Sequence, residues 1–297
     1  MVTTTTATKL SIVIAITLWA SAYAGIRLAL LAGFSPEGLA LLRYLIASCC
    51  MGIIYFRMPK RQTFSLKEMS QFFCVGIVGI AVYNIALNYG ELTVSSGMAS
   101  FIISQSPAVA ALFAIIFLGE PLNRYNLLGL AVCMFGIFVI AMGEVGAIVW
   151  SDGLLYVLIA TIAGGLYNVM QKSLLNRFHV IEAISFVIWG ATLFLCIYTK
   201  QLQHDLAQAS WSSTLIVVYL GIFPAAIAYL AWGYALREMP TAKAVSFLYF
   251  MPFIATMIGW ITLGEVPAMM SLVGGVIAIF GVWLVNQSYS SGSTAKC

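Results

Sequence analysis

The chain alternates between long apolar stretches and short breaks that contain glycine, proline or charged residues. Most stretches are close to the roughly 20 residues that a helix needs to cross the hydrocarbon core of a bilayer. We expect ten helices, over residues 10–31, 37–56, 69–90, 95–118, 125–142, 153–173, 181–199, 213–236, 242–263 and 269–287. The pattern therefore predicts an all-α, polytopic membrane protein.

The first apolar stretch resembles the start of a secretory signal peptide. Lys9 and the run from Leu10 to Trp19 are followed by the small residues Ala20-Ser21-Ala22. The run continues to Leu31, however, and further apolar stretches follow it. We interpret it as the first transmembrane helix, preceded by a threonine-rich tail.

Composition agrees with this interpretation. The 297 residues are 62% hydrophobic and only 8% charged, with a mean hydropathy of +1.00. Soluble domains carry about 25% charged residues, so this chain cannot cover a water-facing surface of its size. The net charge of +4 is spread along the chain, whereas nucleic-acid-binding proteins cluster basic residues on one face. We therefore expect a lipid bilayer, and no nucleic acid, as a partner.

The basic residues indicate the orientation. If the N-terminus is cytoplasmic, Lys200 is the basic residue that falls clearly outside, and Arg27 and Arg43 lie within spans. The inside set is Lys9, Arg57, Lys60, Arg61, Lys67, Arg124, Lys172, Arg177, Arg237, Lys243 and Lys296. By the positive-inside rule, this bias predicts an even number of spans with both termini in the cytoplasm. We expect a multi-pass protein of the bacterial inner membrane.

An internal repeat relates the two halves of the chain. At an offset of 145 residues, Pro107 matches Pro252, and Leu118-Gly119-Glu120 matches Leu263-Gly264-Glu265. The offset spans five helices, an odd number, so the halves must have opposite orientations. We expect two inverted repeats, over residues 10–142 and 143–287, with tails at 1–9 and 288–297. Inverted repeats are typical of secondary transporters, which bind substrate near the bilayer midplane.

These motifs resemble a known family. The two copies of a span with Pro and Leu-Gly-Glu, the sequence Leu18-Trp19-Ala20-Ser21, and Leu42-Arg43-Tyr44 in the second span look like EamA modules. Two such modules make up the ten-span branch of the drug/metabolite transporter superfamily. The resemblance implies a central cavity lined by spans 1, 3, 4, 6, 8 and 9, with spans 5 and 10 at the periphery. It also implies export of amino acids, other metabolites or drugs.

Two positions depart from the family pattern or break the repeat. Arg27 stands where many relatives carry lysine. The position equivalent to Arg43 in the second half falls near Val187, so that half lacks the charge. We therefore expect the two halves to bind a substrate asymmetrically.

Polar and aromatic residues inside spans indicate the faces that turn toward the bundle interior, because exposing polar groups to lipid is costly. Helical spacing places several of them on common faces. The candidate substrate-binding residues are Trp19, Tyr23, Asn84, Asn88, Gln105, Tyr167, Asn168, Tyr229, Trp232, Tyr249 and Phe250. The small-residue ridge Ser96, Ser100, Ser104 and Ala108 fits close helix packing better than ligand contact.

Other residues suggest gating. Arg27 and Arg43 lie toward the outer side at a depth similar to that of Glu37 and Glu91, which suggests an ion pair. Capture of a substrate carboxylate by one arginine is the alternative, because a guanidinium grips carboxylates bidentately. Pro107 and Pro252 each interrupt a backbone hydrogen bond within a span. The interruptions either permit bending or fix a packing kink.

The sequence predicts no metal site, no cofactor and no enzyme activity. Its two histidines, His179 and His204, lie in predicted links, and its cysteines show no metal-binding spacing. No acidic residue falls in the middle of a predicted span, which disfavours a permanently cationic substrate.

We therefore expect a secondary transporter, monomeric or homodimeric, that exports amino acids or similar neutral or aromatic metabolites. Transport of phosphorylated sugars, nucleotides or drugs and a non-transporting membrane scaffold are the alternatives.

Overall fold

The computed structural model describes residues 5–94, 96–119, 124–144, 152–263 and 269–291. These residues form helices joined by short links, with no strand among them. Nine helices lie in the first half of the order: α1 (Thr6–Leu31), α2 (Pro36–Phe56), α3 (Leu66–Gly76), η1 (Ile77–Val82), α4 (Tyr83–Thr93), α5 (Ser96–Ile103), α6 (Ser106–Phe113), η2 (Ala114–Leu118) and α7 (Arg124–Glu144).

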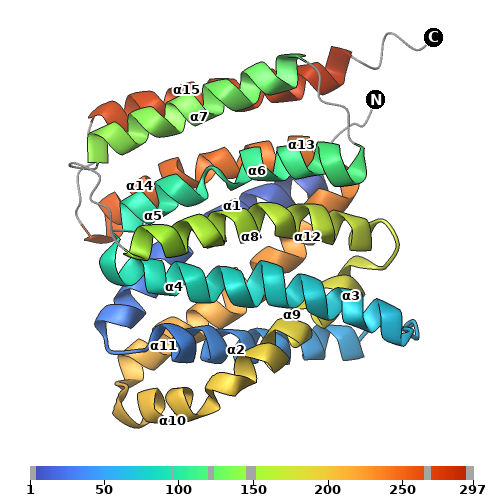
Figure 1. The fold of residues 1–297 in the computed structure, drawn as a ribbon, viewed down its shortest axis with the longest axis vertical. Helices are drawn as coiled ribbons and strands as arrows, with labels where there is room; N and C mark the ends of the chain where they lie inside the picture. The colour runs from blue at the N-terminus through green and yellow to red at the C-terminus, as the bar shows by residue number, and fades with distance from the viewer. Residues whose placement is uncertain (1–4, 95, 120–123, 145–151, 264–268, 292–297) are drawn as a thin grey trace.

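The second half repeats this order with additional short turns. Its elements are α8 (Asp152–Leu175), α9 (Val180–Leu195), η3 (Cys196–Tyr198), α10 (Thr199–Gln208), α11 (Trp211–Ile222), η4 (Phe223–Ile227), α12 (Ala228–Glu238), α13 (Thr241–Ser246), η5 (Phe247–Phe250), α14 (Met251–Leu263) and α15 (Met269–Ser291). Figure 1 shows the first turn of α1 and the last turn of α15 at the same end of the bundle.

Helices occupy each of the ten predicted ranges. Within the described residues, six continuous helical stretches are long and apolar enough to cross a membrane: Thr6–Leu31, Pro36–Phe56, Leu66–Thr93, Asp152–Leu175, Val180–Gln208 and Trp211–Glu238. Shorter apolar helices cover Ser106–Leu118, Thr241–Ala255 and Leu272–Leu284. The all-helical class is confirmed, and the crossing of the membrane by all ten ranges stays a prediction.

Two helix ends differ from the sequence-based boundaries. α1 begins at Thr6, inside the expected tail, because the Thr5 hydroxyl caps it by accepting a hydrogen bond from the Thr8 backbone N–H. The helix predicted to end at 199 continues through α10 to Gln208. There the Asp205 carboxylate accepts hydrogen bonds from the Ser35 N–H and hydroxyl, at 3.1 and 2.6 Å. The polar sequence of α10 is thus held in place by its contact with Ser35, the residue that precedes α2 in the other half of the chain.

The helices are interrupted at matching places in the two halves. A π-helical turn, η1, joins α3 to α4, and a second, η4, joins α11 to α12. Ser104 and Gln105 separate α5 from α6, and the 3-10 turn η5 lies at the equivalent point between α13 and α14. Pro107 and Pro252 stand in the first turn of the helices that follow, where a missing N–H leaves no intrahelical bond unmade. Pro107 thus begins a new helix after a break, whereas Pro252 follows the 3-10 turn η5 inside the helical stretch Thr241–Ala255.

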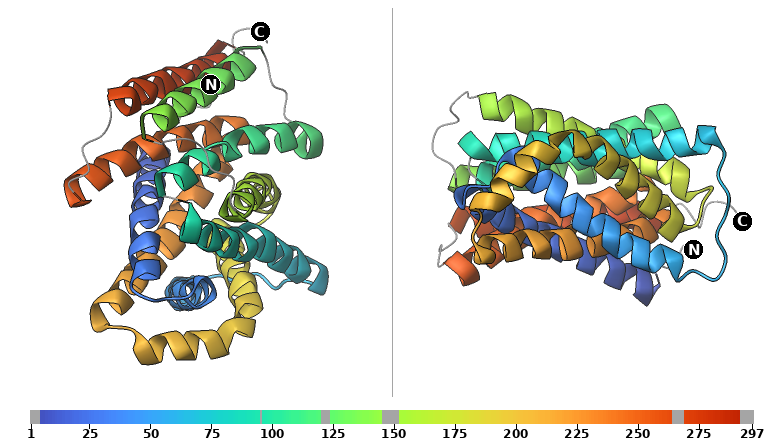
Figure 2. Two further views of the ribbon diagram at one scale, coloured as in Figure 1. Left: turned by 60° about the vertical axis from the view of Figure 1, so that its left-hand side comes forward. Right: turned by 90° about the horizontal axis from the view of Figure 1, so that it is seen from below.

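A pair of helices, α7 and α15, forms a separate outer layer. Figures 1 and 2 show the two side by side at one edge of the bundle, and they pack closely on each other. The contact joins residues that are 145 apart, since the Cys133 thiol donates to the carbonyl oxygen of Ala278 at 3.5 Å. The outer faces of this pair expose large apolar side chains, including Phe135, Phe138 and Phe280. Such a surface fits lipid contact.

Glycines allow this close approach, and one of them provides a test. A Cβ atom on Gly136 would lie 2.5 Å from the Ala278 nitrogen and 2.7 Å from the Gly274 oxygen. Because backbone atoms cannot easily move, we expect Gly136→Ala to destabilise the protein by about 1–3 kcal/mol. A Cβ on Gly52 in α2 would meet nothing within 4 Å, so Gly52→Ala should be neutral or stabilising by up to about 1 kcal/mol. Thermal unfolding in detergent checks this pair, and equal shifts in the two variants would contradict the packing.

Candidate functional site

A cavity lies inside the bundle, between the helices of the two halves. It contains about 760 Å³ of space not occupied by atoms, including its open part. Its lining residues are Trp19, Ala22, Tyr23, Ile26, Arg43, Gly79, Tyr83, Asn84, Leu87, Ile103, Ser104, Ser106, Gly164, Tyr167, Asn168, Tyr229, Leu248 and Met251. Within the described chain, α7 and α15 contribute none of them. The cavity is therefore built from the inner helices, with α2 contributing Arg43.

Interrupted backbone surrounds the cavity. Gly79 lies in the π-helical turn η1, Ser104 and Ser106 lie at the break between α5 and α6, and Leu248 lies in η5. Irregular backbone at membrane depth is tolerated where it is buried in protein or lines a water-filled space. Single π-helical turns also occur frequently at functional sites. The interruptions therefore lie at the cavity.

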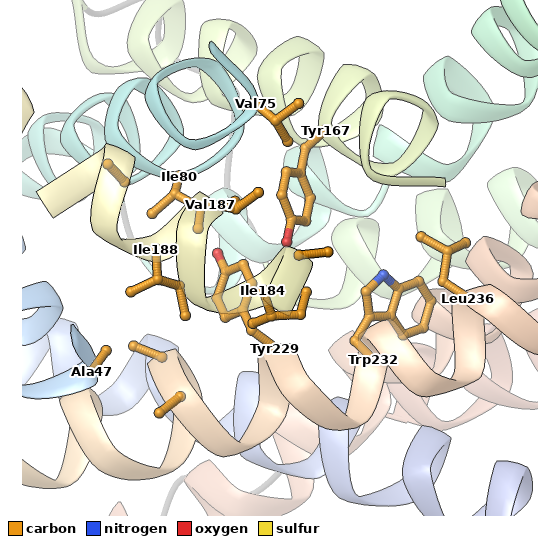
Figure 3. Packing of buried hydrophobic residues seen from close by; sticks show 14 of the residues in the cluster. Ala47, Val75, Ile80, Tyr167, Ile184, Val187, Ile188, Tyr229, Trp232 and Leu236 are labelled. Atoms are coloured by element: carbon orange, nitrogen blue, oxygen red, sulfur yellow. The ribbon is translucent and has the colours of Figure 1, made fainter. Parts of the chain in front are cut away.

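Aromatic side chains form one wall of the cavity. The rings of Trp19 and Tyr229 meet edge to face with centroids 5.3 Å apart, and those of Tyr167 and Tyr229 do so at 5.8 Å. The Trp19 indole N–H donates to the carbonyl of Pro224 in η4 at 3.1 Å, which fixes the ring across the two halves of the chain. Figure 3 shows Tyr167 of α8 and Tyr229 of α12 in the same part of the core. Such a wall can hold an apolar or aromatic group, or an ammonium group through cation–π attraction.

A buried hydrogen-bond network adjoins this wall. Arg43 Nη1 donates to Asn84 Oδ1 at 2.9 Å, and Asn84 Nδ2 donates to the Tyr44 hydroxyl and to the Ile80 carbonyl, each at 2.8 Å. The Tyr44 hydroxyl in turn donates to the Tyr229 hydroxyl at 3.2 Å. The network connects α2, α4 and α12 and fixes the one charged side chain among the described lining residues.

Two cations tie helix ends at opposite ends of the bundle. Arg27 donates to the backbone carbonyl of Glu91 at the end of α4. Lys172 Nζ donates to the carbonyls of Leu236, Arg237 and Met239 at the end of α12, at 2.7, 3.1 and 2.8 Å. Arg27 and Lys172 are 145 residues apart, as are Glu91 and Leu236. A cation at a helix C-terminus is favourable, because the last carbonyls have no partner within the helix.

The predicted gating residues are placed as follows. Arg27 and Glu91 meet through the Glu91 backbone, whereas both Glu91 carboxylate oxygens are buried without a hydrogen bond. The Glu37 carboxylate accepts a hydrogen bond from the Tyr89 hydroxyl. The salt bridges that the structure shows among its described residues, Arg177–Glu68 and His204–Asp205, include none of these four side chains.

The predicted substrate-binding residues divide into two groups. Trp19, Tyr23, Asn84, Tyr167, Asn168 and Tyr229 line the cavity together with Arg43. The others lie outside it. Asn88 donates a hydrogen bond to the Pro36 carbonyl at 2.8 Å. Trp232 is not a lining residue, and its indole N–H donates to the Asn168 side chain at 2.8 Å. Tyr249 lies in a core cluster that includes residues of α7 and α15. Gln105 and Phe250 are half-buried beside the interruptions at Ser104 and η5.

Several lining residues were missed by sequence reasoning. Tyr83 lies about 100° around a regular helix from Asn84, so a search for one polar face excluded it. Ser104 was assigned to the small-residue ridge of close helix packing, and it lines the cavity together with Ser106. Gly79 and Gly164 have no side chain that a search for polar or aromatic residues could find. The aromatic character of Tyr83, next to an amide inside a span, is the signal that was available.

The described residues contain no group of three or more histidine, cysteine, aspartate or glutamate side chains that could hold a metal ion. The geometry is that of a binding cavity within a helical membrane bundle. A family model describing EamA-like transporters matches the chain twice, over residues 7–142 and 151–287. The chain belongs to the EamA-like transporter family. The resemblance noted in its sequence is thereby confirmed.

Relatives of this EamA-like transporter agree with the assignment. The chain is 35% identical to the uncharacterized transporter YdfC of Bacillus subtilis, over 89% of this chain and 86% of that protein. It is 33% identical to a probable terminal-alkyne amino-acid exporter of Streptantibioticus cattleyicolor, over 93% and 92% of the two chains. A solved crystal structure with 17% sequence identity matches 95% of this chain and 98% of its own, with a TM-score of 0.78, and shares the fold. The protein is a multi-pass membrane transporter.

Proposed function

We propose that this EamA-like transporter exports amino acids or related small neutral or aromatic metabolites across the bacterial inner membrane. The observation that carries the proposal is the interior cavity, whose wall combines Trp19, Tyr167 and Tyr229 with the amides of Asn84 and Asn168. Aromatic faces suit an apolar or ammonium-bearing group, and amides suit the polar groups of a small metabolite. A relative of high coverage is named as a probable amino-acid exporter, which supports this class of cargo.

The charges of the cavity favour this class over its rivals. The described lining residues include one basic side chain, Arg43, and no aspartate or glutamate. Phosphate esters call for several basic groups, and a permanent cation is expected to have an acidic partner inside the membrane. A neutral or zwitterionic molecule requires neither.

In the proposed mechanism, the cavity opens to the two sides of the membrane in turn. We infer ten spans in two inverted halves, with both termini in the cytoplasm, as the positive-inside pattern and the 145-residue repeat predict. The ties of Arg27 to α4 and of Lys172 to α12 lie at opposite ends of the bundle. In each state, the hydrogen bonds of one cation would break while those of the other remain, so that the cavity opens at one end of the bundle at a time.

Ligand-dependent thermal stability tests the substrate class. Purified protein in detergent is heated with amino acids, nucleosides, sugar phosphates or cationic drugs. A ligand that binds the folded state alone stabilises it by about 2.7 kcal/mol at a hundred times its dissociation constant. We expect neutral or aromatic amino acids to raise the melting temperature of the wild type, and Tyr23→Ala to abolish the rise.

Tyr125→Ala is the matched control, because Tyr125 is exposed on the outer helix α7, and it should retain the response. Efflux of the stabilising amino acid from proteoliposomes then establishes transport. Stabilisation by phosphate esters or cationic drugs alone would overturn the proposed substrate class.

A further inference from the structure

We infer that Arg43 binds the carboxylate of the substrate, and that this transporter therefore recognises organic carboxylates with an apolar body, with or without an amino group. The inference rests on the proposed function, which it makes more specific. It names Arg43 as the residue that decides which end of the molecule is recognised. It also predicts that the carboxylate, and not the ammonium group, is the charge that the cavity requires.

The first support is the environment of the guanidinium group. Arg43 is 4% exposed, in a helix that lies within the membrane bundle. Its one hydrogen bond in the structure joins Nη1 to the neutral Asn84 amide, and Nε is buried without a partner. Neither salt bridge of the described residues includes Arg43, so no described carboxylate contacts it within 4.0 Å; the buried Glu91 carboxylate acts on it electrostatically from farther away. A buried cation is strongly unfavourable unless it is paired, and among the described residues Arg43 has no carboxylate in direct contact.

The second support is the orientation of the donors. Asn84 is held by hydrogen bonds to Tyr44 and to the Ile80 carbonyl, so its Oδ1 is fixed toward Arg43 Nη1. That bond leaves Nε and Nη2 of Arg43, which form one edge of the planar group. Two parallel donors on one edge match the two oxygens of a carboxylate. A lysine at this position would supply the charge without that paired geometry.

The third support is the contrast between the two halves of the chain. The position equivalent to Arg43 in the second half is near Val187, which is buried and apolar. No acidic side chain lines the cavity within the described chain, so an amino group would meet only hydroxyls, amides and aromatic faces. A bound molecule thus gains a charge-assisted contact at its carboxylate alone, while Trp19 and Tyr229 accommodate its apolar part.

Three probes separate the two charges of an amino acid. Phenylalanine carries both, phenylalaninamide lacks the carboxylate, and 3-phenylpropionate lacks the amino group. Equilibrium binding to the purified wild type is measured for each. We expect phenylalanine and 3-phenylpropionate to bind with similar affinity and the amide at least tenfold more weakly, because a hydrogen bond to a charged group contributes enough for such a factor.

Variants assign the preference to Arg43. Arg43→Gln should bind all three probes with equal, weak affinity, and Arg43→Lys should retain part of the preference. Asn84→Asp offers a second test, because it places a carboxylate next to Arg43 that repels the carboxylate of the probe. We expect it to weaken the binding of phenylalanine and 3-phenylpropionate at least tenfold. Arg124→Gln, which removes an exposed arginine at the start of α7, is the matched control and should behave as the wild type.

The outcomes distinguish the two proposals. If the wild type binds phenylalanine and its amide equally well, or if Arg43→Gln keeps the preference, the role of Arg43 is wrong while amino-acid binding stands. If none of the three probes and no other amino acid binds, both proposals fail. If phosphate esters bind in their place and Arg43→Gln abolishes that binding, Arg43 receives an anion but the carboxylate class and the proposed function are both overturned.

Discussion

Replacing Trp232 with alanine should lower the free energy of unfolding by about 3–5 kcal/mol, in the range found for large aromatic residues in protein cores. Trp232 is the largest fully buried side chain among the described residues, and its ring contacts Trp19 at a centroid distance of 5.5 Å. Its removal leaves a void among α1, α8, α9 and α12, as the packing in Figure 3 indicates. Thermal or denaturant unfolding in detergent measures the loss.

Two further variants separate the packing of Trp232 from its hydrogen bond. Trp232→Phe keeps most of the ring but removes the N–H that holds the Asn168 side chain at 2.8 Å. Because Asn168 lines the cavity, this variant should weaken ligand binding more than it weakens folding. Trp211→Ala removes a tryptophan that is 78% exposed and should change the unfolding free energy by less than about 0.5 kcal/mol. Similar losses in Trp211→Ala and Trp232→Ala would contradict the assigned burial.

Lys172→Met should destabilise the protein by roughly 3 kcal/mol, because hydrogen bonds to charged groups contribute about 1.5–3 kcal/mol each and are not fully additive. The substitution preserves much of the side-chain volume but leaves the carbonyls of Leu236, Arg237 and Met239 without the ammonium donor. The end of α12 then loses its tie to α8. We expect a lower melting temperature and faster hydrogen exchange at the C-terminal turn of α12.

Lys200→Met is the matched control, since Lys200 is exposed on α10. It should leave both the melting temperature and the exchange at α12 unchanged. Lys172→Arg retains the charge and should recover part of the stability. An equal response of Lys172→Met and Lys200→Met would show that the tie does not stabilise the end of α12.

The helices could be predicted from the sequence because membrane helices are marked by length and apolar composition. The breaks within them could be predicted only where a proline marks them. The π-helical turn η1 lies in apolar sequence that is equally compatible with a continuous helix. Pro107 marked an interruption near Ser104, but not whether the helix would bend there or stop, and η4 contains Pro224, which the sequence analysis did not consider. The helix through Asp205 was missed for the opposite reason, since its polar sequence is helical only because it contacts the start of α2.

The site was predictable in part for a related reason. Spans that are apolar on all sides do not show which face turns inward, so polar and aromatic residues had to mark it. That rule found Tyr23, Asn84 and Tyr167, which line the cavity. It also selected Trp232 and Tyr249, which are equally aromatic but pack against other helices. Which buried aromatic residue faces a ligand depends on how the helices are rotated, and one sequence does not contain that information.

The difference between Arg43 and Val187 has a consequence for how this protein evolved. In an assembly of two identical five-helix chains, every substitution appears twice, so a cation in one half is always accompanied by a cation in the other. A single chain that contains both halves is free of this constraint, and here one half has arginine where the other has a buried valine. A cavity between identical halves offers a ligand two equivalent orientations. With the role proposed for Arg43, this cavity offers one, so a chain with two unlike halves allows selection to act on the direction in which a molecule lies during its passage.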